Sequence, residues 1–291
     1  MVVANGGNDF SKGDLIMRKV LLATTALVAM NVTAAQAFDL SIGGNYEFEY
    51  TTDDAGDAAT SDGQISFSAS KTADNGVTWS WNGDMKNDDG TGFEGSYIKA
   101  SSDDMGTLYL GDVDDDALTL MDGALGINND IESQNTPAGV TTVTSNGNSE
   151  VNYISPSIAG LKLGVAMDVD NGKTGYAINY SMAGVSLYYG GTETGSSVGA
   201  KGSLAGFTIA AGSRSVDNSS EKSSDIALKY TLDNGITVAG VSARGTTALG
   251  AKVKYSNIGA SYAITDGVAA KIESGDNDGN GYTWASVHVT F

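Results

Sequence analysis

The sequence predicts an all-β fold, a transmembrane antiparallel β-barrel of sixteen strands. Three observations support this prediction. A segment near the N-terminus has the pattern of an export signal, and no later apolar run is long enough to form a membrane-spanning helix. Segments of strand length, each with one apolar and one polar face, recur through the rest of the chain. The last of these segments runs to the terminal residue, Phe291.

The N-terminal segment has the three parts of a secretory signal. Arg18 and Lys19 form a charged region, residues 20–30 form an apolar stretch, and Ala35–Ala37 is a typical cleavage site. A stretch of eleven residues is too short to cross a bilayer as a helix. We therefore interpret residues 17–37 as a signal peptide.

The mature domain is expected at residues 38–291, and residues 1–16 are interpreted as a misassigned start or a disordered leader. The mature domain contains 33 acidic and 13 basic residues. This charge argues against a nucleic-acid partner, which requires a basic surface. The chain has no cysteine and only one histidine, His288. These counts argue against disulfides, a zinc site and a catalytic triad, so we expect no enzymatic activity.

Alternation along the strands separates two faces. In residues 40–50 one face is apolar or aromatic, and the other carries serine, asparagine and glutamate. Residues 161–169 and 226–232 show the same pattern, with nearly all charges on the second face. A soluble β-sandwich would also alternate. Strands of about ten residues with tyrosine and tryptophan near their ends favour a barrel in a membrane.

The connections differ at the two ends of the strands. Short turns such as Asn75-Gly76, Ala183-Gly184 and Asn234-Gly235 predict tight hairpins. The opposite connections are predicted to be longer and acidic, at residues 51–62, 84–92 and 276–281. Because bacterial barrels of one chain have even strand numbers, we predict sixteen strands and leave fourteen or eighteen open. This count treats part of residues 248–264 as one long strand.

One connection, at residues 112–149, is much longer than the others. It is the third long loop from the first strand, and loops of this length are usually functional. It contains apolar residues spaced as in a short helix, and its first part has no basic residue. Its acidic residues are Asp112, Asp114, Asp115, Asp116, Asp122, Asp130 and Glu132.

Several motifs of this sequence resemble the trimeric general diffusion porins, especially those of alphaproteobacteria. They are Gly106–Asp112 before the acidic loop, Asn152–Gly160 after it, and the terminal Phe291. The resemblance covers residues 38–291. It implies an outer-membrane homotrimer whose third loop folds into the barrel and places its acidic residues at the pore constriction.

The resemblance also implies partners. Phe291 would be the assembly signal read by the barrel-assembly machinery, and the barrel would lie in outer-membrane lipid with lipopolysaccharide. No cofactor is required, although similar porins can hold calcium, here at Asp112, Asp114 and Asp116.

A basic wall is expected opposite the acidic loop. Strand parity and position suggest Lys99, Lys201, Arg214, Lys229, Lys252, Lys254 and Lys271 as its candidates. Arginines are few, so the acidic loop predicts a weak preference for cations.

The sequence therefore predicts a water-filled channel for passive diffusion of ions and small hydrophilic solutes. Two alternatives stay open, a substrate-specific outer-membrane channel and a non-channel surface barrel or adhesin. The first would need an ordered ligand track in the lumen. The short outer loops argue against the second.

Overall fold

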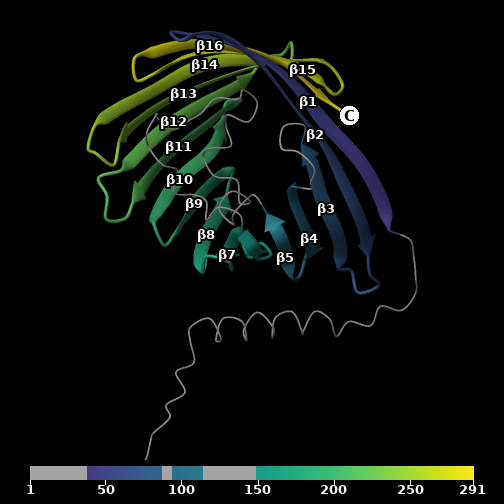
Figure 1. Cartoon of the computed structure of the whole chain (residues 1–291). Coiled ribbons are helices and arrows are strands. Elements are labelled where there is room, and N and C mark those ends of the chain that lie inside the picture. Colours follow the sequence, from purple (N-terminus) through teal and green to yellow (C-terminus); the bar gives the residue numbers. More distant parts are fainter. Residues whose placement is uncertain (1–37, 87–93, 114–148) are drawn as a thin grey trace, which may run out of the picture. The chain divides into compact units, whose positions relative to one another are not determined.

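The computed structural model describes residues 38–86, 94–113 and 149–291. These residues form one closed barrel of sixteen strands, and each strand pairs antiparallel with its two neighbours (Figure 1). The predicted all-β barrel and its strand number are confirmed, whereas the signal peptide lies outside the described residues. No helix among the described residues is long and apolar enough to cross a membrane.

The strands are β1 (Asp39–Asp53), β2 (Gly56–Thr72), β3 (Thr78–Lys86), β4 (Glu94–Ser102), β5 (Gly106–Val113), β6 (Ser149–Ile154), β7 (Leu161–Asp168), β8 (Lys173–Met182), β9 (Val185–Thr192), β10 (Gly195–Leu204), β11 (Phe207–Val216), β12 (Lys222–Thr231), β13 (Ile236–Thr246), β14 (Lys252–Thr265), β15 (Val268–Asn277) and β16 (Asn280–Thr290).

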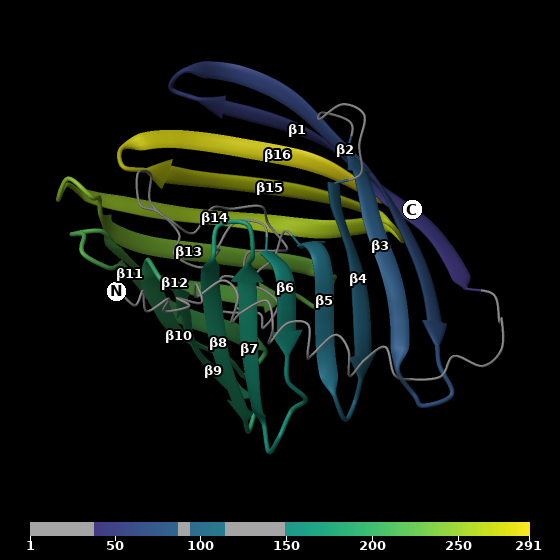
Figure 2. The ribbon, with the colours of Figure 1, turned by 60° about the horizontal axis from the view of Figure 1, so that its bottom comes forward.

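The first and last strands lie side by side and close the barrel (Figure 2). Their ladder is extended by Phe291, which exchanges two backbone hydrogen bonds with Gly44, at N···O distances of 2.8 and 3.0 Å. A Cβ atom at position 44 would lie 2.8 Å from the Phe291 ring, so the ring packs over the glycine. The terminal residue is therefore a structural part of the seam.

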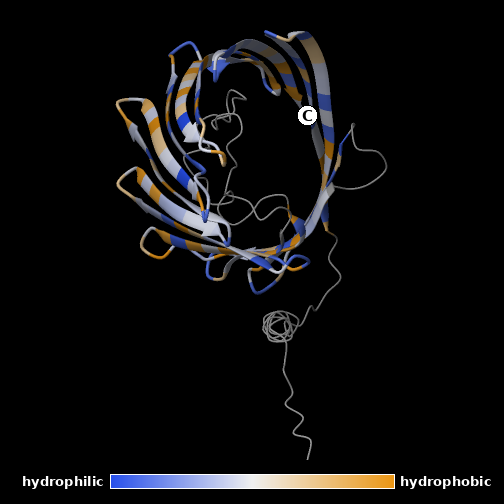
Figure 3. Cartoon of the chain, turned by 60° about the vertical axis from the view of Figure 1, so that its left-hand side comes forward, coloured by the Kyte–Doolittle hydropathy of each residue, from blue (hydrophilic) through white to orange (hydrophobic). Residues whose placement is uncertain are grey.

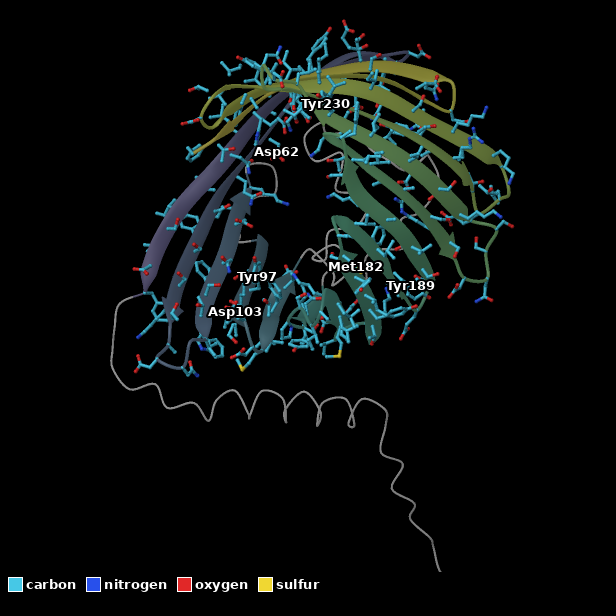
Figure 4. All side chains as sticks on the ribbon, turned by 180° about the vertical axis from the view of Figure 1, so that it is seen from behind. Asp62, Tyr97, Asp103, Met182, Tyr189 and Tyr230 are labelled. Atoms are coloured by element: carbon cyan, nitrogen blue, oxygen red, sulfur yellow. The ribbon has the colours of Figure 1, made fainter. Side chains whose placement is uncertain are left out.

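Hydrophobic and hydrophilic residues alternate along the strands (Figure 3), and side chains project from both sides of the wall (Figure 4). On β1, Phe48 on the outward face is 49% exposed, whereas the adjacent Glu47 on the lumen face is 8% exposed. Large apolar side chains cover the outside of most strands. Soluble proteins rarely expose apolar surface of this extent. A closed barrel satisfies its backbone internally, so this surface is suited to lipid.

The predicted short turns are present. In the turn between β8 and β9, Ala183 and Gly184 have φ angles of 52° and 80°, as a type I′ hairpin requires. At Asn75-Gly76 and Asn234-Gly235 only the glycine has positive φ. There the asparagine side chain accepts a hydrogen bond from the backbone N–H two residues later. The polar side chain and the glycine thus stabilise the turn in different ways.

Two of the predicted long loops are wrong. At residues 51–62 the chain continues as paired strands to Asp53↔Gly56. The Asp53 carboxylate accepts hydrogen bonds from the backbone N–H groups of Ala55 (2.8 Å) and Gly56 (3.2 Å), which closes a tight turn. At this tip, hydrogen bonds from the side chains of Thr52 and Tyr50 lower the pKa of Asp57.

Residues 276–281 likewise form a tight hairpin, with pairing up to Asn277↔Asn280. The acidic residues at these tips suggested loops. Polar side chains do not interrupt a backbone ladder, however, so the strands stay paired up to the tips. Two connections are longer than the short turns, namely residues 87–93 and 114–148. Both lie outside the described residues. We call the end of the barrel that carries them the outer end and the opposite one the short-turn end.

Candidate functional site

The lumen face of the wall is polar and built largely from small side chains. Its apolar members are mainly alanines, including Ala166, Ala177, Ala210 and Ala227. Larger rings lie flat where a glycine leaves room: a Cβ atom at Gly199 would overlap the Tyr188 ring. The consequence is a wall that keeps its side chains close to the backbone, as a solute-filled lumen requires.

Lysines gather on the lumen wall near the short-turn end. Lys162 on β7, Lys201 on β10 and Lys229 on β12 line one cavity of about 820 Å³. The same cavity is lined by six serine and threonine side chains, by Asn179 and by Tyr109. Of the described residues that line it, none is acidic. We call this cavity the lysine pocket.

Lys99 on β4 lies beside the lysine pocket, because it is paired with Tyr109, one of the residues that line it. Its ammonium nitrogen lies 5.8 Å from the ring centroid of Tyr109. This distance permits a cation–π interaction. Tyr109 in turn contacts Tyr97, with ring centroids 5.6 Å apart. The lysine pocket therefore combines ammonium groups with hydroxyl and amide groups, the chemistry that binds anionic or hydroxyl-rich solutes.

A second cavity, of about 430 Å³, lies at the outer end. Asp53, Asp54 and Glu273 line it together with the rings of Tyr282 and Trp284. We call it the acidic mouth pocket. Acidic groups thus predominate in this pocket, whereas basic groups predominate in the lysine pocket at the other end of the strands.

A hydrogen-bond chain fixes the wall of the acidic mouth pocket. The amide of Asn257 donates to the Tyr255 hydroxyl (2.8 Å), which bonds to the Tyr282 hydroxyl (2.7 Å). Tyr282 donates to Glu273. A Cβ atom at Gly275 would lie 2.7 Å from the Tyr282 ring, so this glycine lets the ring lie along the wall.

Two further pairs of oppositely charged side chains lie in the lumen wall. Arg214 and Asp225 form an ion pair at 3.1 Å, with side chains 4% and 1% exposed. Arg214 also donates to the Ser223 hydroxyl at 3.2 Å. At the seam, Glu47 accepts a 2.5 Å hydrogen bond from Ser286 and lies 3.7 Å from the Lys271 ammonium group. These side chains hold neighbouring strands together.

The structure places five of the seven candidates for the basic wall on the lumen face, and their role at a pore constriction stays a prediction. Lys99, Lys201, Arg214, Lys229 and Lys271 lie on the lumen face. Lys162 also lines the lumen, although it was not among the residues predicted for the basic wall. Its alternation with Leu161 and Leu163 was the sequence pattern that could have placed it on the lumen face.

Lys252 and Lys254 were wrongly expected in the lumen. Both are exposed on the outward face of β14, because Val253 and Tyr255 occupy the lumen face. The Tyr255 hydroxyl finds partners in Tyr282 and Asn257 on that side.

The predicted acidic constriction mostly lies outside the described residues. Asp112 is exposed on β5. The structure does not describe Asp114, Asp115, Asp116, Asp122, Asp130 or Glu132. The inward-folded third loop and the calcium site at Asp112, Asp114 and Asp116 stay predictions.

A closed sixteen-stranded barrel with a lipid-facing exterior and a polar interior defines a membrane channel of the outer-membrane type. The family model described as Gram-negative porin matches residues 23–290. The chain belongs to this family and is an outer-membrane diffusion channel by class, as its motifs suggested.

Solved porin structures share the fold. An OmpF of Salmonella typhi in complex with daunomycin has 14% identity and a TM-score of 0.71, with 88% of this chain and 98% of that chain covered. A mutant of the Rh. blastica porin has 16% identity and a TM-score of 0.67, covering 87% and 100%. The trimer form of OmpT, an outer membrane protein of Vibrio cholerae, has 9% identity and a TM-score of 0.67, covering 88% and 100%. No curated protein matches this sequence.

Proposed function

We propose that the protein is a passive, water-filled channel for ions and small hydrophilic solutes, with a weak preference for cations. The observation that carries the proposal is the polar, small-residue lumen of the closed barrel. The acidic excess of the mature domain supports the sign of the selectivity. The lysines of the lumen wall repel cations, so the expected preference for cations is weak.

Planar-bilayer recording of the refolded mature domain tests this function. Under a tenfold potassium chloride gradient, a perfect cation channel would show a reversal potential of about 59 mV, the limit for one charge. We expect the dilute side to become positive by a fraction of that limit. Absence of conductance steps, or steps abolished by one solute alone, would contradict a general pore.

A second candidate function is a channel that favours anionic solutes. The lysine pocket is the observation that favours it, since ammonium and hydroxyl groups bind carboxylates and phosphates. The same recording separates the two functions: a dilute side that becomes negative would indicate anion preference.

We further propose that the protein works as a homotrimer in outer-membrane lipid that includes lipopolysaccharide. The trimer form of the similar Vibrio cholerae OmpT supports the oligomeric state. Chemical cross-linking in detergent should then produce bands up to the trimer and none above it. A monomeric barrel that still conducts would contradict the trimer without affecting the channel function.

A further inference from the structure

The acidic mouth pocket contains a carboxylate that the surrounding wall satisfies at only one of its two oxygens. Glu273 on β15 lines this pocket and is 3% exposed. Its Oε1 atom accepts the hydrogen bond from Tyr282. Its Oε2 atom is buried and has no hydrogen-bond partner among the described residues. A buried oxygen without a donor is unfavourable, so a ligand that brings a donor to Oε2 would be stabilised there.

The hydrogen-bond chain behind Glu273 runs in one direction. Tyr282 uses its single hydroxyl proton toward Glu273, so it accepts the proton of Tyr255. Tyr255 in turn accepts a hydrogen bond from the Asn257 amide. Both hydroxyl protons are therefore engaged. The chain holds the carboxylate in place and leaves Oε2 to a donor from outside the wall.

Strand register places an aromatic ring opposite each of two carboxylates. Trp284 on β16 is paired with Glu273 on β15, and Tyr282 on β16 is paired with Asp53 on β1. Cβ atoms at such paired positions are about 4.5–5.5 Å apart. All four residues line the acidic mouth pocket. A ring face beside a carboxylate is suited to an organic cation, because the ring attracts the charge and also contacts the carbon part of the ligand.

The charges that line the acidic mouth pocket have one sign. Asp53, Asp54 and Glu273 line it, and none of the described residues that line it is basic. Lys271 lies two residues before Glu273 on β15, but its ammonium group is 3.7 Å from Glu47 at the seam. The volume of about 430 Å³ lies within the usual range of small-molecule sites, about 300–1,000 Å³. The pocket therefore has the size and the charge to hold a small cation.

We propose that the acidic mouth pocket binds small primary alkylammonium ions. The ammonium group donates a hydrogen bond to Oε2 of Glu273, and the carbon chain lies against the rings of Trp284 and Tyr282. Hydrogen bonds between two charged groups are stronger than those between neutral groups. A potassium ion has neither N–H donors nor a carbon chain, so the pocket distinguishes amines from inorganic cations. The proposal rests on the channel function above and names the class of cation that the outer end favours.

An NMR titration that follows the ligand signals tests the proposal on the full mature barrel in a neutral detergent, with protein-free micelles as the blank. The probes are n-butylammonium chloride and 1-butanol, which has a similar shape but no charge, at constant ionic strength. Wild type should bind n-butylammonium about tenfold more tightly or better, as expected for a hydrogen bond to a charged group. Tetramethylammonium, which has the charge but no N–H group, should bind more weakly than n-butylammonium.

Three variants locate the binding. Glu273→Gln keeps the length of the side chain and removes its charge, so the affinity for n-butylammonium should fall about tenfold or more. Trp284→Leu removes the ring without changing any charge and should weaken binding about two- to fivefold, the range of an exposed cation–π contact. Glu193→Gln is the matched control. It makes the same change in the turn between β9 and β10, outside the pocket, and should bind as wild type does.

Four outcomes would overturn the proposal. Equal binding of n-butylammonium and 1-butanol by wild type would indicate an apolar cavity, and equal binding of tetramethylammonium would show that no N–H donor is used. An unchanged affinity in Glu273→Gln would exclude its carboxylate. An equal loss in Glu193→Gln would indicate a general attraction of the acidic barrel for cations.

If Glu273→Gln does not fold, the probes on wild type and the loss in Trp284→Leu decide the question. The titration requires no membrane. A barrel that conducts potassium in a bilayer without binding n-butylammonium would therefore refute the site and leave the channel function intact.

Discussion

The seam between the first and last strands depends on a single glycine. At Gly44 a Cβ atom would lie 2.5 Å from the Gln64 carbonyl oxygen and 2.8 Å from the Phe291 ring. The backbone oxygen cannot move without disturbing the β1–β2 ladder. The terminal ring likewise cannot move without weakening its two hydrogen bonds to residue 44.

We therefore expect Gly44→Ala to destabilise the barrel by about 1–3 kcal/mol, the usual cost of overpacking. Urea unfolding followed by the gel mobility of unheated samples would measure this. Gly281→Ala on β16 is the matched control, because no atom lies within 4 Å of its added Cβ. If both variants unfold at the same urea concentration, the ring does not pack as described.

Arg214 and Asp225 allow a test of pairing inside the lumen wall. Both side chains are almost completely buried, so removal of one leaves the other charge without its partner. We expect R214Q or D225N to lower the free energy of unfolding by about 3 kcal/mol, the lower limit for breaking a buried pair. The double variant R214Q/D225N should recover most of the loss.

Arg244→Gln is the control for the single variants, since it makes the same change at an exposed arginine. Its free energy of unfolding should stay within about 0.5 kcal/mol of wild type. Urea unfolding of wild type, R214Q, D225N and R214Q/D225N provides the double-mutant cycle. Additive losses in R214Q/D225N would show that the two side chains do not act as a pair.

The faces of most single residues could be predicted from sequence, but β14 shows the limit. Lys252, Val253, Lys254 and Tyr255 alternate, so either pair fits one face. The rule that charges face the lumen selected the lysines. The structure selects Tyr255 instead, because its hydroxyl completes a hydrogen-bond chain with residues of β14 and β16. Such partners, distant in sequence, are not visible in a local pattern.

At the level of strands, alternation and short turns were sufficient to predict the barrel and its strand number. They were insufficient for the hairpin tips, where acidic residues at 51–62 were mistaken for a loop. Side-chain polarity indicates whether a segment is exposed to solvent. Strand pairing depends instead on backbone register and on side chains that close the turn, such as Asp53. The lysine pocket was also only partly predicted, because its members come from separate strands and meet through the curvature of the wall.

The lysine pocket carries a prediction about selectivity. The triple variant K162Q/K201Q/K229Q removes three positive charges from one cavity while keeping side chains of similar length. We expect the reversal potential to shift toward the cation limit, because the acidic groups of the lumen are then opposed by fewer positive charges. Bilayer recording under a salt gradient measures this shift.

Lys252→Gln is the control for this variant, since that lysine lies outside the lumen and should not change the reversal potential. A triple variant with the reversal potential of wild type would show that permeating ions do not pass near the lysine pocket. A shift in the control of the same size would show that overall charge, and not the lumen wall, sets the selectivity.

The whole molecule has an excess of acidic residues but separates its charges. Acidic groups line the pocket at the outer end, and lysines line the cavity near the short turns. An ion that crosses the lumen therefore meets groups of both signs in succession. Selectivity then depends on how far each group acts through the water of the channel.

This dependence predicts the effect of salt. The screening length is about 10 Å at 0.1 M and about 3 Å at 1 M ionic strength. At 0.1 M the acidic excess of the whole barrel acts on the permeating ion, so cation preference should be largest. At 1 M only groups in contact with the ion act, so the preference should fall toward zero. Reversal potentials under a constant tenfold gradient, measured from low to high mean salt, check this. A preference that does not change with salt would mean that a few groups in direct contact with the ion determine selectivity, and that the charge of the molecule as a whole does not.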